Sequence, residues 1–135
     1  MMNQIKKGLT ATYTKNTTSN DAYPSSNTGT LDYLVSTPSL VAMIIDGATN
    51  MLDKLLPADY ITVGKNIELH HAHPSLVGEM ITLKLQVDSV EGHSIILDVQ
   101  ASDSKGVVCT GKYERSVINK DKLLEIAYHR APGLL

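Results

Sequence analysis

The stretch STPSLVAMIIDGATNMLDKLLP, residues 36 to 57, decides the fold of this chain. Thr37 suits the N-cap of a helix, because a hydroxyl can accept a hydrogen bond from a free backbone N–H, and Pro38 suits the first helical position. Apolar residues then occur on nearly every side of the helix, whereas a helix at a protein surface needs only an apolar stripe of about 100°. We therefore predict a central helix wrapped by other structure, which ends in LLPAD at residues 55 to 59.

The second half of the chain alternates apolar and polar residues with a period of two, which indicates strands with one buried face. The apolar positions of three such strands are Ile61, Val63, Ile67 and Leu69; Ile81, Leu83, Leu85 and Val87; and Ile95, Leu97, Val99 and Ala101. Turn residues at 91–92 and 102–106 separate strands at hairpin spacing, and a last strand follows in VVCTGKYERSVI. A long helix before an antiparallel meander predicts an α+β fold with the sheet wrapped around the helix, the hotdog arrangement. Period and order alone also allow other α+β packings.

The two ends of the chain are less regular. Residues 8–13, GLTATY, alternate weakly and are a candidate first strand. Residues 14–30 are almost all turn formers, and so long a connection inside a compact domain predicts a lid or a flexible loop. Asn119 can cap a short C-terminal helix over residues 119–130, which would pack on an edge or face of the sheet. Residues 1–135 are expected to form a single domain.

Composition narrows the classes of partner. Lysine and arginine are scattered through a chain of net charge -2, so the basic patch of a nucleic-acid-binding protein is missing. Cys109 is the only cysteine, which excludes an intrachain disulfide and a multi-cysteine zinc site and agrees with a reducing cytoplasm. The chain has no apolar stretch of membrane-spanning length. We expect a soluble, cytoplasmic protein with no nucleic-acid or membrane partner.

Three histidines lie close together in HHAH, residues 70–73. If the strand that starts near Ile61 continues to residue 73, His71 and His73 share its buried face, whereas His70 points the other way. A neutral imidazole with a pKa of about 6.5 is a natural general acid or base. A structural histidine and a metal ligand are the alternatives, since His-x-His on a strand can place two nitrogens on one ion.

Asp46 interrupts the apolar middle of the predicted helix. An unpaired carboxylate there is costly, so it is hydrogen-bonded, protonated, or exposed at an interface with a cleft. It is a candidate partner that activates water or orients a histidine, and the candidate third ligand of a metal; a bond to a backbone amide is the structural alternative. Gly47 beside it is expected to admit the close approach of a backbone or a ligand, and Gly64 to mark a bulge or such an approach. Thr37 lies among free N–H groups that could stabilise an oxyanion.

Taken together, three segments resemble the fluoroacetyl-CoA thioesterase-like branch of the hotdog thioesterases. They are STPSLVAMIIDGA, TVGKNIELHHAHPSLVGEMIT and VEGHSIILDVQASDSKGVVCTGKYERSVI, and the resemblance covers roughly residues 33–118. The family pattern has a threonine-proline helix start, a helical acid that is usually glutamate, a Val-Gly pair, and a histidine seven residues after that glycine. A turn and a Gly-x-His-Glu-Arg strand follow, and Tyr113 stands where that histidine is usual.

Carried over by position, the resemblance implies functional roles for Thr37, Gly64 and His71. The spacings from Gly64 to His71 and from His71 to Gly78 are seven residues each, which selects His71 over its neighbours. The family acid lies eight residues after the threonine, which is Ile45 here, while Asp46 lies at nine. One residue turns a helix by about 100°. Either the helix start shifts so that Asp46 takes the place of the acid, with Ser39 or Thr37 supplying the hydroxyl, or the acid is absent.

The resemblance implies an acyl-CoA thioesterase that hydrolyses a short or small acyl-CoA thioester to the free acid and CoA without a cofactor. Asp46 and His71 would share the work of the base, and Thr37 with nearby backbone amides would hold the thioester oxygen. The residues expected to contact the substrate are Ser39, Gly64 and His73. Because hotdog proteins usually pair their sheets across a dimer, we expect at least a homodimer.

Three alternatives compete with this hypothesis. A catalytically weak acyl-CoA-binding hotdog module is favoured by the displaced acid. A metal-binding protein would use His71 and His73. A hotdog hydratase needs a histidine five residues after a helical aspartate, and Met51 stands at that spacing from Asp46, which argues against it.

Overall fold

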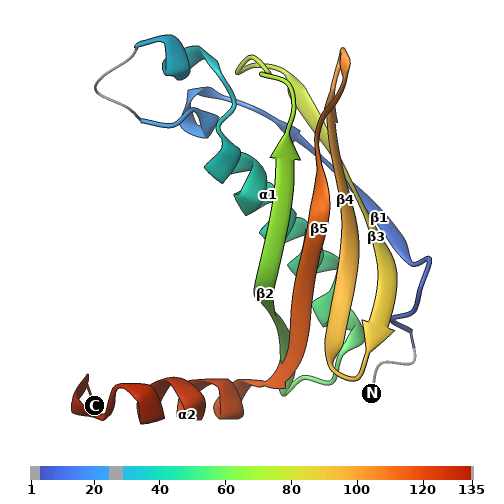
Figure 1. Cartoon of the computed structure of the whole chain (residues 1–135), viewed down its shortest axis with the longest axis vertical. Coiled ribbons are helices and arrows are strands. Elements are labelled where there is room, and N and C mark those ends of the chain that lie inside the picture. Colours follow the sequence, from blue (N-terminus) through green and yellow to red (C-terminus); the bar gives the residue numbers. More distant parts are fainter. Residues whose placement is uncertain (1–3, 25–28, 135) are drawn as a thin grey trace.

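The structure is a computed structural model that describes residues 4–24 and 29–134. Within that part of the chain, five strands and two α-helices follow one another (Figure 1). Their bounds are β1 (Thr10–Asn16), α1 (Thr37–Leu52), β2 (Tyr60–His71), β3 (Met80–Glu91), β4 (Ser94–Asp103), β5 (Gly106–Asn119) and α2 (Lys120–Arg130). Short 3-10 helices lie at η1 (Ser19–Asp21), η2 (Gly29–Tyr33), η3 (Asp53–Leu55) and η4 (Pro132–Leu134).

The strands form one antiparallel sheet in the order β1-β3-β4-β5-β2. The sheet curls around α1, which crosses one of its faces (Figure 1). The predicted α+β fold, a sheet wrapped around a long helix, is therefore confirmed. The predicted meander holds for β3, β4 and β5, but β2 pairs with β5 and forms an edge of the sheet.

The hydrophobic core lies between α1 and the sheet. The buried residues of the helix are Leu40, Ile44, Ala48, Met51 and Leu52, and those of β3 and β4 are Ile81, Leu83, Leu85, Val87, Ile95, Leu97, Val99 and Ala101. Gly47 allows this close packing, because an added Cβ would lie 3.0 Å from Cδ2 of Leu83 and 3.1 Å from Cδ2 of Tyr13. The close approach expected at Gly47 is therefore made by side chains of β1 and β3.

One face of α1 lies outside this core. Ile45 is 40% exposed, and Asp46 beside it is also exposed. The prediction that other structure wraps the helix on all sides is therefore wrong for this face of the single chain. The sheet covers the helix from one side only, and of the alternatives given for Asp46 the observed one is therefore exposure.

A bulge in β2 changes which residues face the core. The pairing of β2 with β5 shifts between Gly64 and Asn66. Thr62 is buried before the bulge, whereas Ile67 and Leu69 pack against the core after it. The prediction that Ile61 and Val63 share a face with Ile67 and Leu69 is therefore wrong, because the extra residue reverses the alternation.

The segment predicted as a lid or flexible loop, residues 14–30, starts with strand. β1 continues to Asn16, and Thr17 then accepts a hydrogen bond from the amide of Gly78 at 3.0 Å and donates one to the carbonyl of Glu79 at 2.6 Å. Thr18 caps η1. The first part of the segment is therefore held in place by hydrogen bonds, and residues 25–28 lie outside the described residues.

The C-terminal helix α2 forms as predicted, with the side chain of Asn119 accepting hydrogen bonds from the amides of Asp121 and Lys122. It projects away from the body of the molecule (Figure 1). None of its residues is buried, so the expectation that it packs onto the sheet is wrong for the single chain. Across residues 4–24 and 29–134, no helix is both long and apolar enough to cross a membrane.

Candidate active site

Thr37 and His71 meet where α1 begins and β2 ends. The N-cap of α1 is Ser36, whose side chain accepts a hydrogen bond from the amide of Ser39 at 3.1 Å. The prediction that Thr37 is the N-cap is wrong by one residue, and this difference releases the Thr37 hydroxyl from capping. Its Oγ1 lies 2.7 Å from Nδ1 of His71. This distance is within the range at which a hydroxyl nucleophile and its base lie in covalent catalysis.

The second nitrogen of His71 has no partner in the described part of the chain. Its Nε2 atom is buried and makes no hydrogen bond to any residue that the structure describes. A neutral imidazole carries one proton, so one ring nitrogen donates and the other accepts. When the Thr37 hydroxyl donates to Nδ1, the proton of the ring is on Nε2, and the histidine is ready to take the hydroxyl proton.

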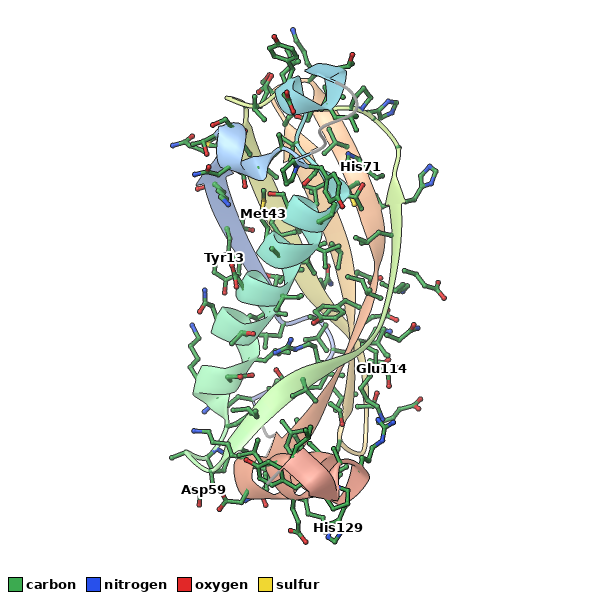
Figure 2. All side chains as sticks on the ribbon, turned by 90° about the vertical axis from the view of Figure 1, so that its left-hand side faces the viewer. Tyr13, Met43, Asp59, His71, Glu114 and His129 are labelled. Atoms are coloured by element: carbon green, nitrogen blue, oxygen red, sulfur yellow. The ribbon has the colours of Figure 1, made fainter. Side chains whose placement is uncertain are left out.

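The pair opens onto an apolar hollow of about 280 Å³. The other residues that line it are Tyr23, Leu31, Leu34, Val35, Ser36, Pro38 and Pro74. No lysine, arginine, aspartate or glutamate is among these lining residues. Figure 2 places His71 at the end of the molecule where α1 starts, beside the loops that form this hollow. The arrangement suits a small uncharged group held next to the Thr37 hydroxyl.

Asp46 is not near His71 in the single chain. It lies nine residues beyond Thr37, which corresponds to about 13 Å along the axis and to the opposite side of the helix. There it lines a different hollow of about 240 Å³, together with Tyr13, Lys15 and Met43. The prediction that Asp46 shares the work of the base with His71 is therefore wrong within one chain.

Ile45 is the residue at which the family spacing would place the acid. It lines a third hollow of about 390 Å³ with Val41, Gly64, Ile67 and Tyr113. Gly64 makes room for Tyr113, because an added Cβ would lie 2.6 Å from the tyrosine hydroxyl oxygen. At the position that the family spacing gives to the acid, an apolar side chain therefore faces that hollow.

Two further predicted site residues lie away from the Thr37–His71 pair. The hydroxyl of Ser39 donates a hydrogen bond to Oδ1 of Asp21 at 2.6 Å, so it does not contact His71. His73 is exposed and follows the end of β2, so it does not share a strand face with His71. In residues 4–24 and 29–134, no three histidine, cysteine, aspartate or glutamate side chains are gathered as metal ligands.

Sequence reasoning missed Asp21, a buried carboxylate next to α1. Burial alone would raise its pKa, but hydrogen bonds from Lys15, Ser39 and the Thr18 amide, together with the charge of Lys15, hold that pKa below its ordinary value. Thr18 and Asp21 form a capping box around η1. The spacing of a threonine and an acid three residues later was the available signal within a run of turn formers.

Arg115 is also buried, and its role is structural. Its guanidinium donates hydrogen bonds to the hydroxyls of Tyr113 at 2.9 Å, Thr49 at 2.9 Å and Thr62 at 2.7 Å. These bonds join β5 to β2 and α1. Cys109 pairs with His71 across the two strands, and burial raises the pKa of its thiol. It is a small residue of the core.

A family model and several solved structures match this chain. The family model of the fluoroacetyl-CoA-specific thioesterase matches residues 17–121. A hot-dog-like protein from Thermanaerovibrio acidaminovorans is 29% identical, with a TM-score of 0.86 over 93% of this chain and 92% of that one. A thioesterase superfamily member from Thermus thermophilus is 19% identical, with a TM-score of 0.85 over 98% of this chain and 96% of that one.

A third solved structure is a mutant of the fluoroacetyl-CoA-specific thioesterase FlK in complex with fluoroacetate and CoA. It is 21% identical to this chain, with a TM-score of 0.81 over 88% of this chain and 99% of that one. No protein with a curated description matches the chain. The architecture is that of the hotdog thioesterases. The match of the family model over most of the chain shows that this protein belongs to the fluoroacetyl-CoA-specific thioesterase family.

Proposed function

We propose that this protein is an acyl-CoA thioesterase that hydrolyses a short or small acyl-CoA thioester to the free acid and CoA. The observation that carries the proposal is the 2.7 Å contact between Thr37 Oγ1 and His71 Nδ1 at the mouth of an apolar hollow. Membership of a thioesterase family supports the reaction class. The proposed reaction uses side chains and water, so it needs no cofactor.

In the proposed reaction, Thr37 Oγ1 attacks the thioester carbonyl carbon while Nδ1 of His71 takes the hydroxyl proton. The C–S bond breaks, an acyl ester forms on Thr37, and the proton passes from His71 to the sulfur of CoA. His71 then removes a proton from water, which attacks the ester carbonyl carbon. The bond from this carbon to Thr37 Oγ1 breaks, the proton passes from His71 to Oγ1, and the acid is released. A positioned base contributes about 10²- to 10⁴-fold to such a step. A direct attack by water activated by His71, with Thr37 holding the oxygen, is the second route.

The start of α1 offers fewer oxyanion donors than we expected from the sequence. The Ser39 amide is bonded to the Ser36 hydroxyl, the Leu40 amide to the Ser36 carbonyl, and Pro38 has no N–H. The Thr37 amide is the one donor of this turn without a hydrogen bond inside the described part of the chain. We therefore assign the oxyanion to the N–H of Thr37, and one such donor is worth about 3 kcal/mol.

The lack of an acid at the position given by the family spacing is expected to lower the rate of hydrolysis. In a triad, the third residue orients the histidine and stabilises the imidazolium that forms. Here Ile45 stands at the acid position, and Nε2 of His71 has no acceptor among the described residues. A catalytically weak acyl-CoA-binding module is therefore the second candidate, and this unpartnered nitrogen is the observation that favours it.

The lining of the hollow favours an uncharged acyl group. Burying a carboxylate without a charged partner is costly, and no cationic side chain is among the described residues that line the hollow. Fluoroacetyl specificity is not part of the proposal. Gly64 and His73 stay candidates for contacts with the remainder of the substrate, whereas Ser39 is engaged by Asp21.

A homodimer is the proposed assembly. β2 is an edge strand whose outer backbone groups have no neighbouring strand among the residues that the structure describes, and such an edge readily pairs with another chain. The adjacent side chain of Ile45 is 40% exposed. Pairing of two β2 edges would cover both features.

The test is thiol release from a panel of acyl-CoAs, measured for the wild type and for Thr37→Val and Asp46→Asn. We expect release from acetyl- to butyryl-CoA, a loss of about 10²-fold or more in Thr37→Val, and no change in Asp46→Asn. If no acyl-CoA is cleaved but one raises the melting temperature, the binding module is correct. Undiminished release by Thr37→Val would contradict the proposed site.

A further inference from the structure

Asp21 accepts hydrogen bonds from Ser36 and Ser39, the residues on either side of Thr37 and Pro38. Its Oδ1 accepts a hydrogen bond from the hydroxyl of Ser39 at 2.6 Å, and its backbone carbonyl accepts one from the amide of Ser36 at 2.8 Å. We infer that Asp21 is a positioning residue that aims the Thr37 hydroxyl at His71. The inference rests on the proposed function, because it gives Asp21 a part in the same reaction.

The direction of the Thr37 side chain depends on how the first turn of α1 is rotated about its axis. Ser36 and Ser39 close this turn through the bond from the Ser39 amide to the Ser36 hydroxyl. Asp21 lies outside the helix and is bonded to both serines, so it fixes the turn against the rest of the protein. A rotation by one residue would be about 100° and would carry Thr37 away from His71.

Asp21 is itself held firmly. Its Oδ1 also accepts a hydrogen bond from Nζ of Lys15 at 2.7 Å, and its Oδ2 accepts one from the amide of Thr18 at 2.9 Å. Lys15 belongs to β1, so the chain of contacts runs from the sheet through Asp21 to α1. A charged hydrogen bond of this kind is stronger than a neutral one, and a buried carboxylate needs such partners.

Asp21 is also bonded to a residue that lines the apolar hollow. Its backbone carbonyl accepts the hydrogen bond from Ser36, and Ser36 is among the lining residues with Thr37. The next residue of this lining, Val35, is held by the hydrogen bond from its amide to the Ser75 carbonyl at 2.8 Å. The contact with Asp21 therefore fixes the part of the lining that leads into α1.

The experiment compares Ser39→Ala, Asp21→Asn and Asp53→Asn in the full-length protein. Ser39→Ala removes one link between Asp21 and α1 but leaves the Lys15 contact. Asp53→Asn is the matched control, because Asp53 accepts hydrogen bonds from Thr62 at the other end of α1. Melting temperature, kcat, KM for the best acyl-CoA, and the ring nitrogen resonances of His71 are measured for each variant.

We expect kcat to fall by roughly ten- to a hundredfold in Ser39→Ala and Asp21→Asn, because a small misplacement of a reacting group has effects of that order. KM should change little, and the Nδ1 resonance of His71 should shift as the contact with Thr37 weakens. Asp53→Asn should lower the melting temperature with kcat unchanged. A folded Ser39→Ala with unchanged kcat and unchanged His71 resonances would overturn the inference. If the wild type cleaves no acyl-CoA, the proposed function fails, and the His71 resonances alone decide the positioning role.

Discussion

Thr37 Oγ1 lies 2.7 Å from His71 Nδ1, so the first residue of α1 contacts the last residue of β2 across 34 positions of sequence. Either residue alone, placed at the other end of its helix or strand, would lack this contact. The contact requires that the helix begins and the strand ends at the same edge of the fold. The contact places the imidazole of His71, a base, beside the hydroxyl of Thr37.

The neighbouring histidines allow a matched test of the base. His71→Ala should lower kcat by about 10²- to 10⁴-fold, the usual contribution of a positioned base. His70→Ala should leave kcat unchanged, because His70 is exposed and lies on the opposite face of the strand. Thiol release measured on both variants, with melting temperatures as a check of folding, compares two changes of equal size one residue apart. Equal losses in the two variants would mean that His71 has no special role.

The composition of the hollow predicts the charge of the acyl group. Butyryl-CoA should be cleaved at least about 10²-fold more efficiently than succinyl-CoA, since a buried carboxylate without a partner is disfavoured by several kcal/mol. The comparison of kcat/KM for the two substrates measures this directly, because both carry the same CoA portion. Preference for succinyl-CoA would show that the acyl group lies elsewhere, with Lys15 in the hollow around Asp46 as one cationic alternative.

Gly64 and Tyr113 should be coupled in stability. Gly64→Ala places a Cβ 2.6 Å from the tyrosine hydroxyl oxygen, and overpacking of this kind costs about 1–3 kcal/mol in the free energy of unfolding. Tyr113→Phe removes that oxygen but leaves the Arg115 guanidinium short of one acceptor. The double variant should therefore lose less stability than the sum of the two single losses in denaturant titrations. Strict additivity would contradict the close contact.

Stability at acid pH should depend on Asp21. Its pKa is lower in the folded protein than its ordinary value, although burial acts in the opposite direction, because Lys15, Ser39 and Thr18 bond to its charged form. The resulting stabilisation is complete above the unfolded-state pKa of about 3.9 and is lost as the pH falls through the folded-state pKa. Asp21→Asn should therefore flatten the decline in the free energy of unfolding below pH ~4.

Asp103 should account for part of the decline that remains in Asp21→Asn. A hydrogen bond from Ser75 and one from the Lys105 amide lower its pKa as well, so the decline in Asp21→Asn should become shallower without vanishing. An unchanged decline in that variant would show that Asp21 is not bonded as the structure describes.

The regular part of the fold could be predicted from the sequence because it follows from hydrophobic periodicity. The long helix and the strands β3, β4 and β5 each repeat their pattern over several turns or residue pairs. The bulge at Gly64 was one of the two alternatives predicted for that glycine and is confirmed. Its effect on the alternation was not foreseen, since apolar residues precede and follow it on positions of the same parity. The N-cap was misplaced by one residue because Ser36 and Thr37 are both good caps. In the structure, the Ser39 amide bonds to the hydroxyl of Ser36, while the hydroxyl of Thr37 contacts His71.

The site was predicted in part. The family spacing selected Thr37 and His71, which lie together in the structure. Asp46 was misjudged because apolar neighbours in sequence do not reveal which face of a helix the sheet covers. Asp21 was missed because its partners Lys15 and Ser39 lie on two other elements, and only folding brings them together.

The central claim is that Thr37 and His71 act as one unit in thioester hydrolysis, and a double-mutant cycle tests it most directly. Thiol release from butyryl-CoA is measured for the wild type, Thr37→Val, His71→Gln and the double variant. Residues that act as a unit give strongly non-additive losses. We predict that the double variant is about as slow as the slower single variant. Losses that multiply, or a folded wild type that releases no thiol from any acyl-CoA, would contradict the account.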